Sequence, residues 1–172
     1  VMALLTSNAG LRVDLPGALR ASSRPQGVVI QRSGDVTFTV ISGEYGVDVP
    51  GELQLPGWTF SAELVGTDGP GLAAQAEPDG LTALLDPALA EAPLWVRGWL
   101  PGDRIQPMGM AGTKKVQDLF VDEKVPRQER GSIPLLVSER GIMWVVGHRI
   151  AEQAKLPANA KLALRVRAQR RV

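Results

Sequence analysis

The segment from Gly109 to Lys115 contains residue types that bind phosphate, namely glycines, a threonine and two adjacent lysines. A nucleotide-binding P-loop requires its second glycine to be followed directly by lysine and then by serine or threonine. Here Thr113 precedes Lys114 and the glycines stand too close together, so the segment does not match a P-loop. Lys114 and Lys115 fall instead at the predicted start of a helix, where free amides and the helix dipole favour an anion. The pattern indicates a contact with a nucleic-acid phosphate, or two lysines that only solvate the helix start.

A second pair of cations, Arg127 and Arg130, is spaced so that both side chains lie on one face of a predicted helical turn. Arginine can hold a phosphate through two parallel hydrogen bonds. Glu123 and Glu129 stand close by in the sequence and could pair with these arginines instead. The spacing therefore leaves phosphate binding and a structural ion pair as alternatives.

Few residues suit catalysis or metal binding. The chain has no cysteine, which excludes thiolate zinc sites, and His148 is its single histidine. Because no nucleophile stands with a base and an orienting acid, we expect His148 to be a packed or surface residue. Asp103 and Arg104 follow Pro101-Gly102, where an aspartate commonly binds the turn amides. Three tryptophans on predicted strands are expected to fill the core, with stacking on an unpaired base as the alternative: Trp95, Trp99 and Trp144.

Net charge divides the chain in two. Residues 1–93 contain 4 basic and 11 acidic residues, a net charge of −7, whereas residues 94–172 contain 15 basic and 7 acidic residues, a net charge of +8. A basic domain releases counterions when it meets phosphates, and an acidic neighbour is repelled by the same backbone. We therefore expect different roles for the two parts, with a polyanionic partner for the second. The alternative is that its lysines and arginines only solvate a surface.

The first part shows the alternation of apolar and polar residues that is typical of half-buried strands. Glycine and proline number 19 and 13, which suits many short strands joined by tight turns. We expect turns at Ser33-Gly34-Asp35 and at Pro56-Gly57. The predicted strands are Val28–Arg32, Val36–Ile41, Trp58–Val65, Leu72–Ala76 and Leu81–Leu85.

The second part combines strands with short helices. Apolar residues at helical spacing predict a helix over Lys114–Glu123, which Thr113 could cap. Pro126 suits the first position of a second helical turn over Arg127–Arg130. The predicted strands cover residues 94–100, 133–138, 142–147 and 162–168.

Together these elements predict an α+β fold, mainly antiparallel β sheets with a few short helices, in two small domains. Residues 86–93 are bracketed by prolines and lack strand alternation, so we place the boundary there. The predicted domains are an acidic, β-rich domain over residues 1–93 and a basic α+β domain over residues 94–172.

Nothing in the sequence predicts a membrane location. No apolar run approaches the roughly 18 residues that a bilayer span needs, and the N-terminus lacks the layout of a secretory signal. We therefore expect a soluble protein without membrane contact, and the lack of cysteine fits the cytoplasm. Val1, Met2, Leu4 and Leu5 are typical of the last turn of a helix, which suggests a fragment of a longer protein.

A resemblance to a known family extends over residues 97–155. The run Arg97-Gly98-Trp99-Leu100-Pro101-Gly102-Asp103-Arg104-Ile105 resembles the Arg-x-x-x-Pro-Gly-Asp-Arg-Ile signature of the C-terminal domain of tRNA(Ile)-lysidine synthetases. Residues 112–122 resemble that family's Gly-x-Lys-Lys-Leu-Lys-Asp-Leu-Phe-Ile-Asp segment, and Lys124-Val125-Pro126 with Arg130 resembles its Lys-Val-Pro-x-x-x-Arg segment. Residues 134–137, 142–147 and 149–151 continue the match in the same order.

The resemblance implies a chemistry that lies elsewhere in the family's enzymes. They use ATP to adenylate the wobble cytidine of isoleucine tRNA and then ligate lysine to it. The catalytic N-terminal domain carries a Ser-Gly-Gly-x-Asp-Ser phosphate loop, which does not occur in these 172 residues. ATP with Mg²⁺ would therefore be the cofactor of that domain, and we expect neither cofactor nor activity in this chain alone.

The role that the resemblance implies for this chain is to hold tRNA(Ile) in the region of its acceptor stem. The remainder of the parent enzyme would be a second partner, and a homodimer is left open. The alternative is a structural or dimerisation module without direct RNA contact. Gln117 stands where the family has a lysine, which removes one phosphate contact. The predicted tRNA-binding residues are Arg97, Arg104, Lys114, Lys115, Lys124 and Arg130 on the family's basic motifs, with Arg127 from the helical pair.

Overall fold

The computed structural model describes residues 12–15, 19–24, 27–32, 38–68 and 80–171. The chain divides into two compact units, Val1–Thr37 and Phe38–Val172. In the first unit, three strands form an antiparallel sheet in the order β1-β2-β3. They are β1 (Arg12–Leu15), β2 (Leu19–Arg24) and β3 (Gly27–Arg32).

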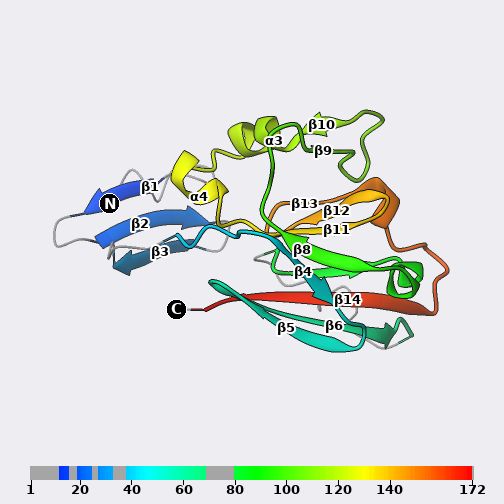
Figure 1. Ribbon diagram of the computed structural model, residues 1–172. Helices are drawn as coiled ribbons and strands as arrows, with labels where there is room; N and C mark the ends of the chain where they lie inside the picture. The colour runs from blue at the N-terminus through cyan, green and yellow to red at the C-terminus, as the bar shows by residue number, and fades with distance from the viewer. Residues whose placement is uncertain (1–11, 16–18, 25–26, 33–37, 69–79, 172) are drawn as a thin grey trace. The chain divides into compact units, whose positions relative to one another are not determined.

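Two antiparallel sheets build the second unit (Figure 1). The five-stranded sheet has the order β13-β12-β11-β8-β4. Its strands are β4 (Glu44–Val47), β8 (Leu94–Arg97), β11 (Leu135–Ser138), β12 (Gly141–Val145) and β13 (Arg149–Ile150). The four-stranded sheet has the order β5-β6-β14-β7. Its strands are β5 (Gly51–Leu55), β6 (Trp58–Gly66), β7 (Thr82–Leu85) and β14 (Leu162–Arg170).

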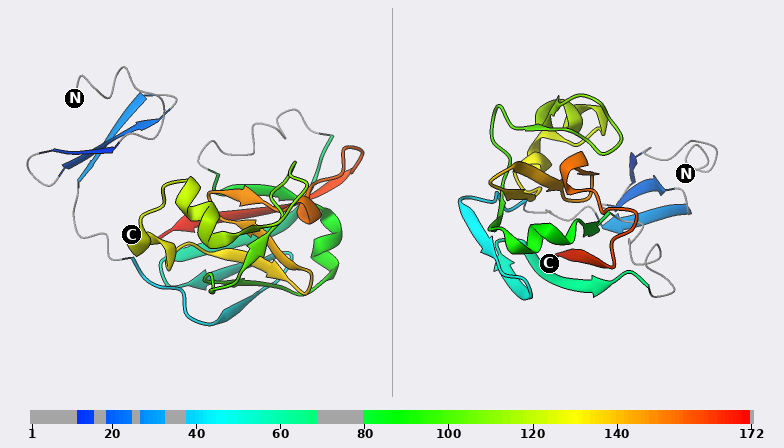
Figure 2. Two further views of the ribbon diagram at one scale, coloured as in Figure 1. Left: turned by 90° about the horizontal axis from the view of Figure 1, so that it is seen from above. Right: turned by 90° about the vertical axis from the view of Figure 1, so that its right-hand side faces the viewer.

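A two-stranded ribbon and two short helices lie on the far side of the five-stranded sheet from the four-stranded sheet (Figures 1 and 2). The ribbon consists of β9 (Arg104–Ile105) and β10 (Lys114–Lys115). The helices are α3 (Val116–Asp122) and α4 (Arg127–Arg130). Two 3-10 turns, η1 (Pro87–Glu91) and η2 (Glu152–Ala154), complete the unit.

The core lies between these layers and draws on every one of them. Phe60 of β6, Leu135 of β11 and Leu164 of β14 are fully buried, and so is Phe120 of α3. Trp144 is also buried, and Trp95 and Trp99 pack against the core, as expected for core tryptophans. Full burial of such side chains contributes about 2 kcal/mol each to stability, so the layers fold as one packed body.

Most of the predicted elements are confirmed. The fold is mainly antiparallel β with short helices, and β3, β6, β7 and the β11–β12 hairpin lie where strands were expected. Residues 38–41 form no strand, so this described part of the predicted strand Val36–Ile41 is wrong. The predicted turn at residues 33–35 and the predicted strand at residues 72–76 lie outside the described residues.

The start predicted for the first helix is wrong. Lys114 and Lys115 form β10, and α3 begins at Val116, whose amide donates to the carbonyl of Asp103 at 2.9 Å. Thr113 does not cap the helix, because its hydroxyl accepts from the Nε atom of Arg104 at 3.1 Å instead. Lys114 and Lys115 have a high helix propensity, but they pair with β9 and therefore form a strand instead of the first residues of α3.

The division between the compact units also differs from the predicted boundary near residue 93. Strand β14 lies between β6 and β7, and β8 pairs with β4, so both sheets contain strands from either side of residue 93. The compact units separate between Thr37 and Phe38. The change of charge at residue 93 therefore falls inside one packed unit.

No helix in the described part of the chain is long and apolar enough to cross a membrane.

Candidate nucleic-acid interface

The β9–β10 ribbon places two cations side by side. In its antiparallel register Arg104 lies opposite Lys115, and Ile105 lies opposite Lys114. Ile105 is 2 % exposed, so one face of the ribbon is turned inward, and alternation puts the exposed Arg104 and Lys115 on the other face. Like charges directly opposite each other repel unless an anion lies between them. The ribbon therefore has the geometry of a phosphate contact.

Arg104 is held by its neighbours without being neutralised. Its Nε and Nη2 atoms donate to the hydroxyl and carbonyl oxygens of Thr113, at 3.1 and 3.4 Å. Within the described ranges, no acidic side chain pairs with Arg104 or with Lys115. The full positive charge of both side chains is thus open to solvent and to a polyanion.

Lys114 differs from its neighbour Lys115. Its ammonium group forms an ion pair with the carboxylate of Asp122 at the other end of α3. The pair fastens the ribbon to the helix, and it cancels most of the charge that Lys114 would offer to a phosphate. Of the two adjacent lysines, Lys115 is the better phosphate ligand.

Lys124 occupies a backbone position that usually belongs to glycine. Its φ is 56°, the one positive φ of a non-glycine residue in the described chain. The amides of Lys124 and Val125 donate to the carbonyls of Val121 and Phe120 at 3.0 and 2.8 Å, which is a Schellman ending for α3. A side chain in this conformation costs about 1 kcal/mol relative to glycine. A strained lysine that is exposed and without a described acidic partner suggests a functional demand on the side chain.

The two arginines of α4 have different surroundings. Arg127 is exposed, whereas Arg130 is half-buried and donates through Nε to the carbonyl of Val125 at 3.1 Å. Glu123, one of the two predicted acidic partners, pairs with neither of them. Arg127 is therefore the more available cation, and Arg130 also fastens α4 to the segment before it.

Arg97 is bound within the protein rather than presented to solvent. Its Nη1 and Nη2 atoms donate to the two carboxylate oxygens of Asp103 at 2.7 and 2.9 Å, and Glu44 lies 3.8 Å from Nε. Gly102, with φ of 93°, makes the turn that lets Asp103 also accept from the amide of Leu100 at 2.8 Å. Both charged side chains are 14 % exposed. Arg97 was predicted to contact tRNA, but its hydrogen-bonding groups are engaged in holding this turn.

The same geometry shifts the pKa of both partners. Burial alone would raise the pKa of Asp103, but hydrogen bonds from Arg97 and Leu100 and the charge of Arg97 hold it below its usual value. The hydrogen bond to Asp103 raises the pKa of Arg97, with burial acting in the opposite direction. The pair therefore remains charged at neutral pH and positions β9 directly after it.

Three residues that the sequence did not single out as a group join α3 to the five-stranded sheet. Glu123 accepts from His148 Nδ1 at 2.5 Å through one oxygen and lies 3.0 Å from Arg149 Nη2 through the other. The His148 ring also packs edge-on against Phe120, with 5.7 Å between ring centroids. No local spacing rule could have found this cluster, because Glu123 and His148 lie 25 residues apart in the sequence. His148 is a packed residue, as expected, and it fixes the end of α3.

Within the described residues, no three side chains of His, Cys, Asp or Glu come together as metal ligands. The structure brings Arg104 to Lys115 by strand register, and it carries Lys124 and Arg127 on the neighbouring helical segments of the same side of the sheet (Figure 1). We define these four exposed cations as the basic face. It is a surface suited to binding phosphates, without an evident reacting group.

Comparison with known proteins identifies relatives of this chain. Residues 94–167 match the family model described as the TilS substrate C-terminal domain. The chain is 41% identical over 170 residues to a tRNA(Ile)-lysidine synthase of Geobacter sulfurreducens, covering 97% of this chain and 35% of that protein. It is 34% identical over 160 residues to the corresponding synthase of Dehalococcoides mccartyi, covering 92% and 33%.

A solved structure described as the crystal structure of the TILS C-terminal domain has a similar fold. The TM-score is 0.62 at 27% sequence identity, and the match covers 74% of this chain and 96% of that one. The chain spans about a third of the length of the two synthases. It therefore belongs to the tRNA(Ile)-lysidine synthase family, in which it corresponds to the C-terminal domain.

Proposed function

We propose that this chain holds tRNA(Ile) for a lysidine synthase by binding backbone phosphates on the basic face. The observation that carries the proposal is the cross-strand pair of Arg104 and Lys115, two exposed cations with no acidic partner among the described residues. Phosphate contacts position a nucleic acid without reading its sequence, so selection of the isoleucine tRNA is not assigned to these residues.

The lysine ligation itself is assigned to the part of the relatives that this chain does not span. The names of the relatives state that activity for whole synthases, which are about three times as long as this chain. The Ser-Gly-Gly-x-Asp-Ser loop that would bind ATP does not occur in the sequence. We therefore propose that the chain alone makes no lysidine, and that ATP and Mg²⁺ act in the other domains of such an enzyme. Incubation with ATP, lysine and the tRNA should give no modified base.

The arrangement of the two ribbon cations also favours a particular region of the tRNA. A ribbon whose two cations lie opposite each other matches closely spaced phosphates along one groove of a duplex, so a base-paired stem is the favoured target. We propose the acceptor-stem region for this contact, because it leaves the anticodon free for chemistry elsewhere. Footprinting of the tRNA should then show protection of the stem backbone near the 3′ end.

The decisive experiment measures tRNA affinity against salt concentration. In the double variant Arg104→Gln with Lys115→Gln, the slope of log affinity against log salt should fall by about 1.8 for a duplex stem, because two phosphate contacts are lost. The matched control is Lys161→Gln with Arg167→Gln, which removes two exposed charges near and on β14. The control should leave the slope nearly unchanged. Equal effects in the two double variants would show that only net charge matters, and no wild-type binding at low salt would favour a structural module.

A further inference from the structure

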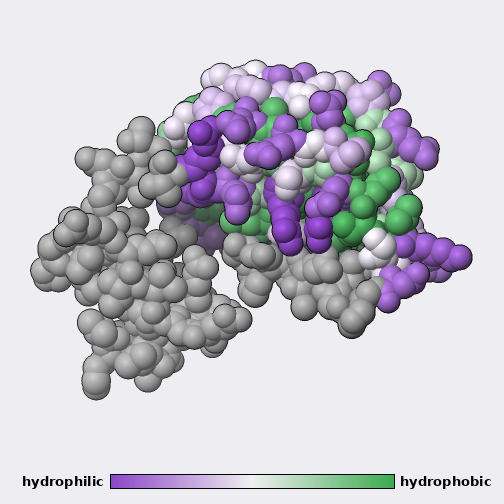
Figure 3. Space-filling model, turned by 90° about the horizontal axis from the view of Figure 1, so that it is seen from below, coloured by the Kyte–Doolittle hydropathy of each residue, from purple (hydrophilic) through white to green (hydrophobic). Residues whose placement is uncertain are grey.

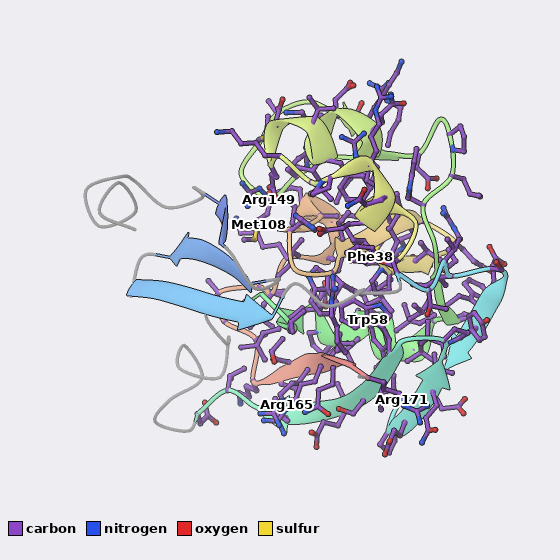
Figure 4. All side chains as sticks on the ribbon, turned by 90° about the vertical axis from the view of Figure 1, so that its left-hand side faces the viewer. Phe38, Trp58, Met108, Arg149, Arg165 and Arg171 are labelled. Carbon is purple, nitrogen blue, oxygen red and sulfur yellow. The ribbon has the colours of Figure 1, made fainter. Side chains whose placement is uncertain are left out.

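A cavity of about 370 Å³ opens at the edge of the five-stranded sheet, between β13 and the β9–β10 loop. Trp144, Met108 and Ile150 give it apolar walls, and Thr82, His148 and Arg149 add polar groups. None of the residues that line it is acidic. Figure 4 labels Met108 and Arg149 and shows them close together on this side of the molecule. A cavity of this size, with apolar walls and a few polar groups, is within the range of small-molecule binding sites.

The walls of the cavity are fixed by backbone hydrogen bonds. The amide of Met108 donates to the carbonyl of Ile150 at 2.9 Å, and the amide of Gly109 donates to the Glu152 carboxylate at 2.6 Å. The first half of the β9–β10 loop is therefore fastened to β13 and η2. A cavity that is formed before the ligand arrives costs less ordering entropy on binding.

Arg149 is directed at the rim by two fixed neighbours. Its guanidinium lies 3.0 Å from the carboxylate of Glu123 and donates to the carbonyl of His148 at 3.1 Å. The side chain is nevertheless 54% exposed, and a guanidinium has five N–H donors, so donors remain for a ligand. A phosphate at the rim and a planar apolar group inside would satisfy both parts of the cavity.

The position of the cavity decides which ligand fits. Met108 lies in the loop that joins the two strands of the ribbon, so one wall of the cavity comes from the same ribbon that carries Arg104 and Lys115. A larger cavity of about 480 Å³, lined by Gln54, Pro56 and Arg171, lies on the four-stranded sheet and has no residue from the ribbon. The smaller cavity is thus the one that a nucleic acid bound to the basic face would reach.

We propose that this cavity holds one unpaired nucleobase of the bound RNA, with Arg149 on the adjoining phosphate. The proposal rests on the proposed function and adds a site to it. A base in a single-stranded extension is favoured over one in a stem, because extruding a paired base costs unstacking and unpairing free energy. The base packs between Met108 and Ile150 with its edge toward Trp144 and Thr82.

The test uses the 172-residue chain and three RNAs with one hairpin stem. One RNA has a single-stranded 3′ extension, the second has the same extension with its bases removed, and the third has none. The first two carry equal phosphate charge, so their affinity ratio measures the bases alone. The wild-type chain should bind the RNA with bases about tenfold more tightly than the abasic one.

Two variants of the β9–β10 loop separate the cavity from general electrostatics. Met108→Asp puts a charge into the cavity, whereas Met110→Asp puts the same charge on a residue of the same loop that does not line it. The two methionines are 48% and 50% exposed, so neither change removes a buried side chain. The tenfold ratio should persist in Met110→Asp and fall to about one in Met108→Asp.

The outcomes distinguish this site from the basic face. If the wild type binds the first two RNAs equally well, the cavity holds no base and the proposal is overturned, while phosphate binding stands. If Met108→Asp and Met110→Asp lower the ratio equally, the base lies elsewhere and the proposal is also overturned. If the wild type binds none of the RNAs at low salt, the proposed function fails and this site fails with it.

Discussion

The basic face and the four-stranded sheet both carry cations from the basic second part of the chain, but the surroundings of those cations differ. On the four-stranded sheet Arg165 of β14 pairs with Glu63 of β6 at 2.6 Å, and Arg170 lies 5.0 Å from the ring centroid of Trp58. Figure 3 shows this side of the molecule, where hydrophilic side chains gather with hydrophobic areas among them. On the basic face, Arg104 and Lys115 have no such partners in the described part of the chain.

The difference explains how one packed unit can combine an acidic and a basic part. Acidic residues of the first part, Glu44 and Glu63, lie beside Arg97 and Arg165 of the second. They neutralise cations on the sheets, where strands from both parts pair. The ribbon and helices come wholly from the second part, and among the described residues no acidic side chain pairs with their exposed cations Arg104 and Lys115. The four cations of the basic face therefore lie on the side where a polyanion is proposed to bind.

Separating residues 94–172 from residues 1–93 should have the largest effect, which is on folding itself. A chain of residues 94–172 lacks β6 and β7, which flank β14 in the four-stranded sheet, and it lacks β4 beside β8. We expect it not to fold cooperatively, whereas a chain of residues 38–172 should. Urea unfolding followed by circular dichroism would measure both. A cooperative transition in residues 94–172 would restore the predicted boundary near residue 93.

The buried ion pair should matter more for stability than any cation of the basic face. Asp103→Asn should lower the free energy of unfolding by about 3 kcal/mol, because it leaves the largely buried Arg97 with only the more distant Glu44, 3.8 Å from Nε, as a charged partner. The matched control, Asp48→Asn, changes an exposed aspartate and should stay within about 0.5 kcal/mol. Urea titration at neutral pH measures both values. A change of less than about 1 kcal/mol in Asp103→Asn would contradict this structural role and would leave Arg97 as a candidate for RNA binding.

The same pair gives a dependence of stability on pH. The folded-state pKa of Asp103 lies below its unfolded value, so its contribution is fully present above about pH 3.9. That contribution is lost as the pH falls through the folded-state pKa. Comparing urea midpoints of wild type and Asp103→Asn from pH 6 down to about pH 2 should show the two curves converging at the acid end. Curves that stay parallel would contradict the lowered pKa.

Adjacent lysines should differ in their contribution to RNA binding. Lys115→Ala should reduce the salt slope of tRNA affinity by about 0.9, and Lys114→Ala by less, because Asp122 already neutralises Lys114. Asp122→Asn should act in the opposite direction and raise the affinity, because it releases the charge of Lys114. Filter binding across a salt series would measure all three variants. Equal slopes for the two lysine variants would show that the ion pair opens when RNA binds.

Lys124 should show the smallest effect and the clearest conflict between stability and binding. Lys124→Gly should raise the free energy of unfolding by about 1 kcal/mol, because glycine adopts a positive φ without strain. It should also weaken tRNA binding by the loss of one phosphate contact. Lys124→Ala is the control, because it removes the charge and keeps the strain. If Lys124→Gly neither raised the free energy of unfolding nor weakened tRNA binding, neither backbone strain nor a phosphate contact would account for a lysine at this position.

Much of this molecule follows from local sequence. Alternating apolar residues predicted β6, β7 and the β11–β12 hairpin, because the pattern of burial in a strand repeats every second residue. The apolar residues of α3 predicted that helix, and the Pro-Gly turn before Asp103 was visible from its composition. The resemblance of residues 97–155 also predicted the family, because those motifs keep their order over a long segment.

Tertiary structure alone decided which cations are free. Nothing local distinguishes Arg97 from Arg104 or Lys114 from Lys115, yet each pair has one member bound to an aspartate and one exposed member. Strand pairing also decided that Lys114 and Lys115 belong to a ribbon and that residues on either side of position 93 share two sheets. The physical reason is that charge pairing and sheet pairing depend on which segments meet in space, and neither has a signature in the spacing of residues along the chain.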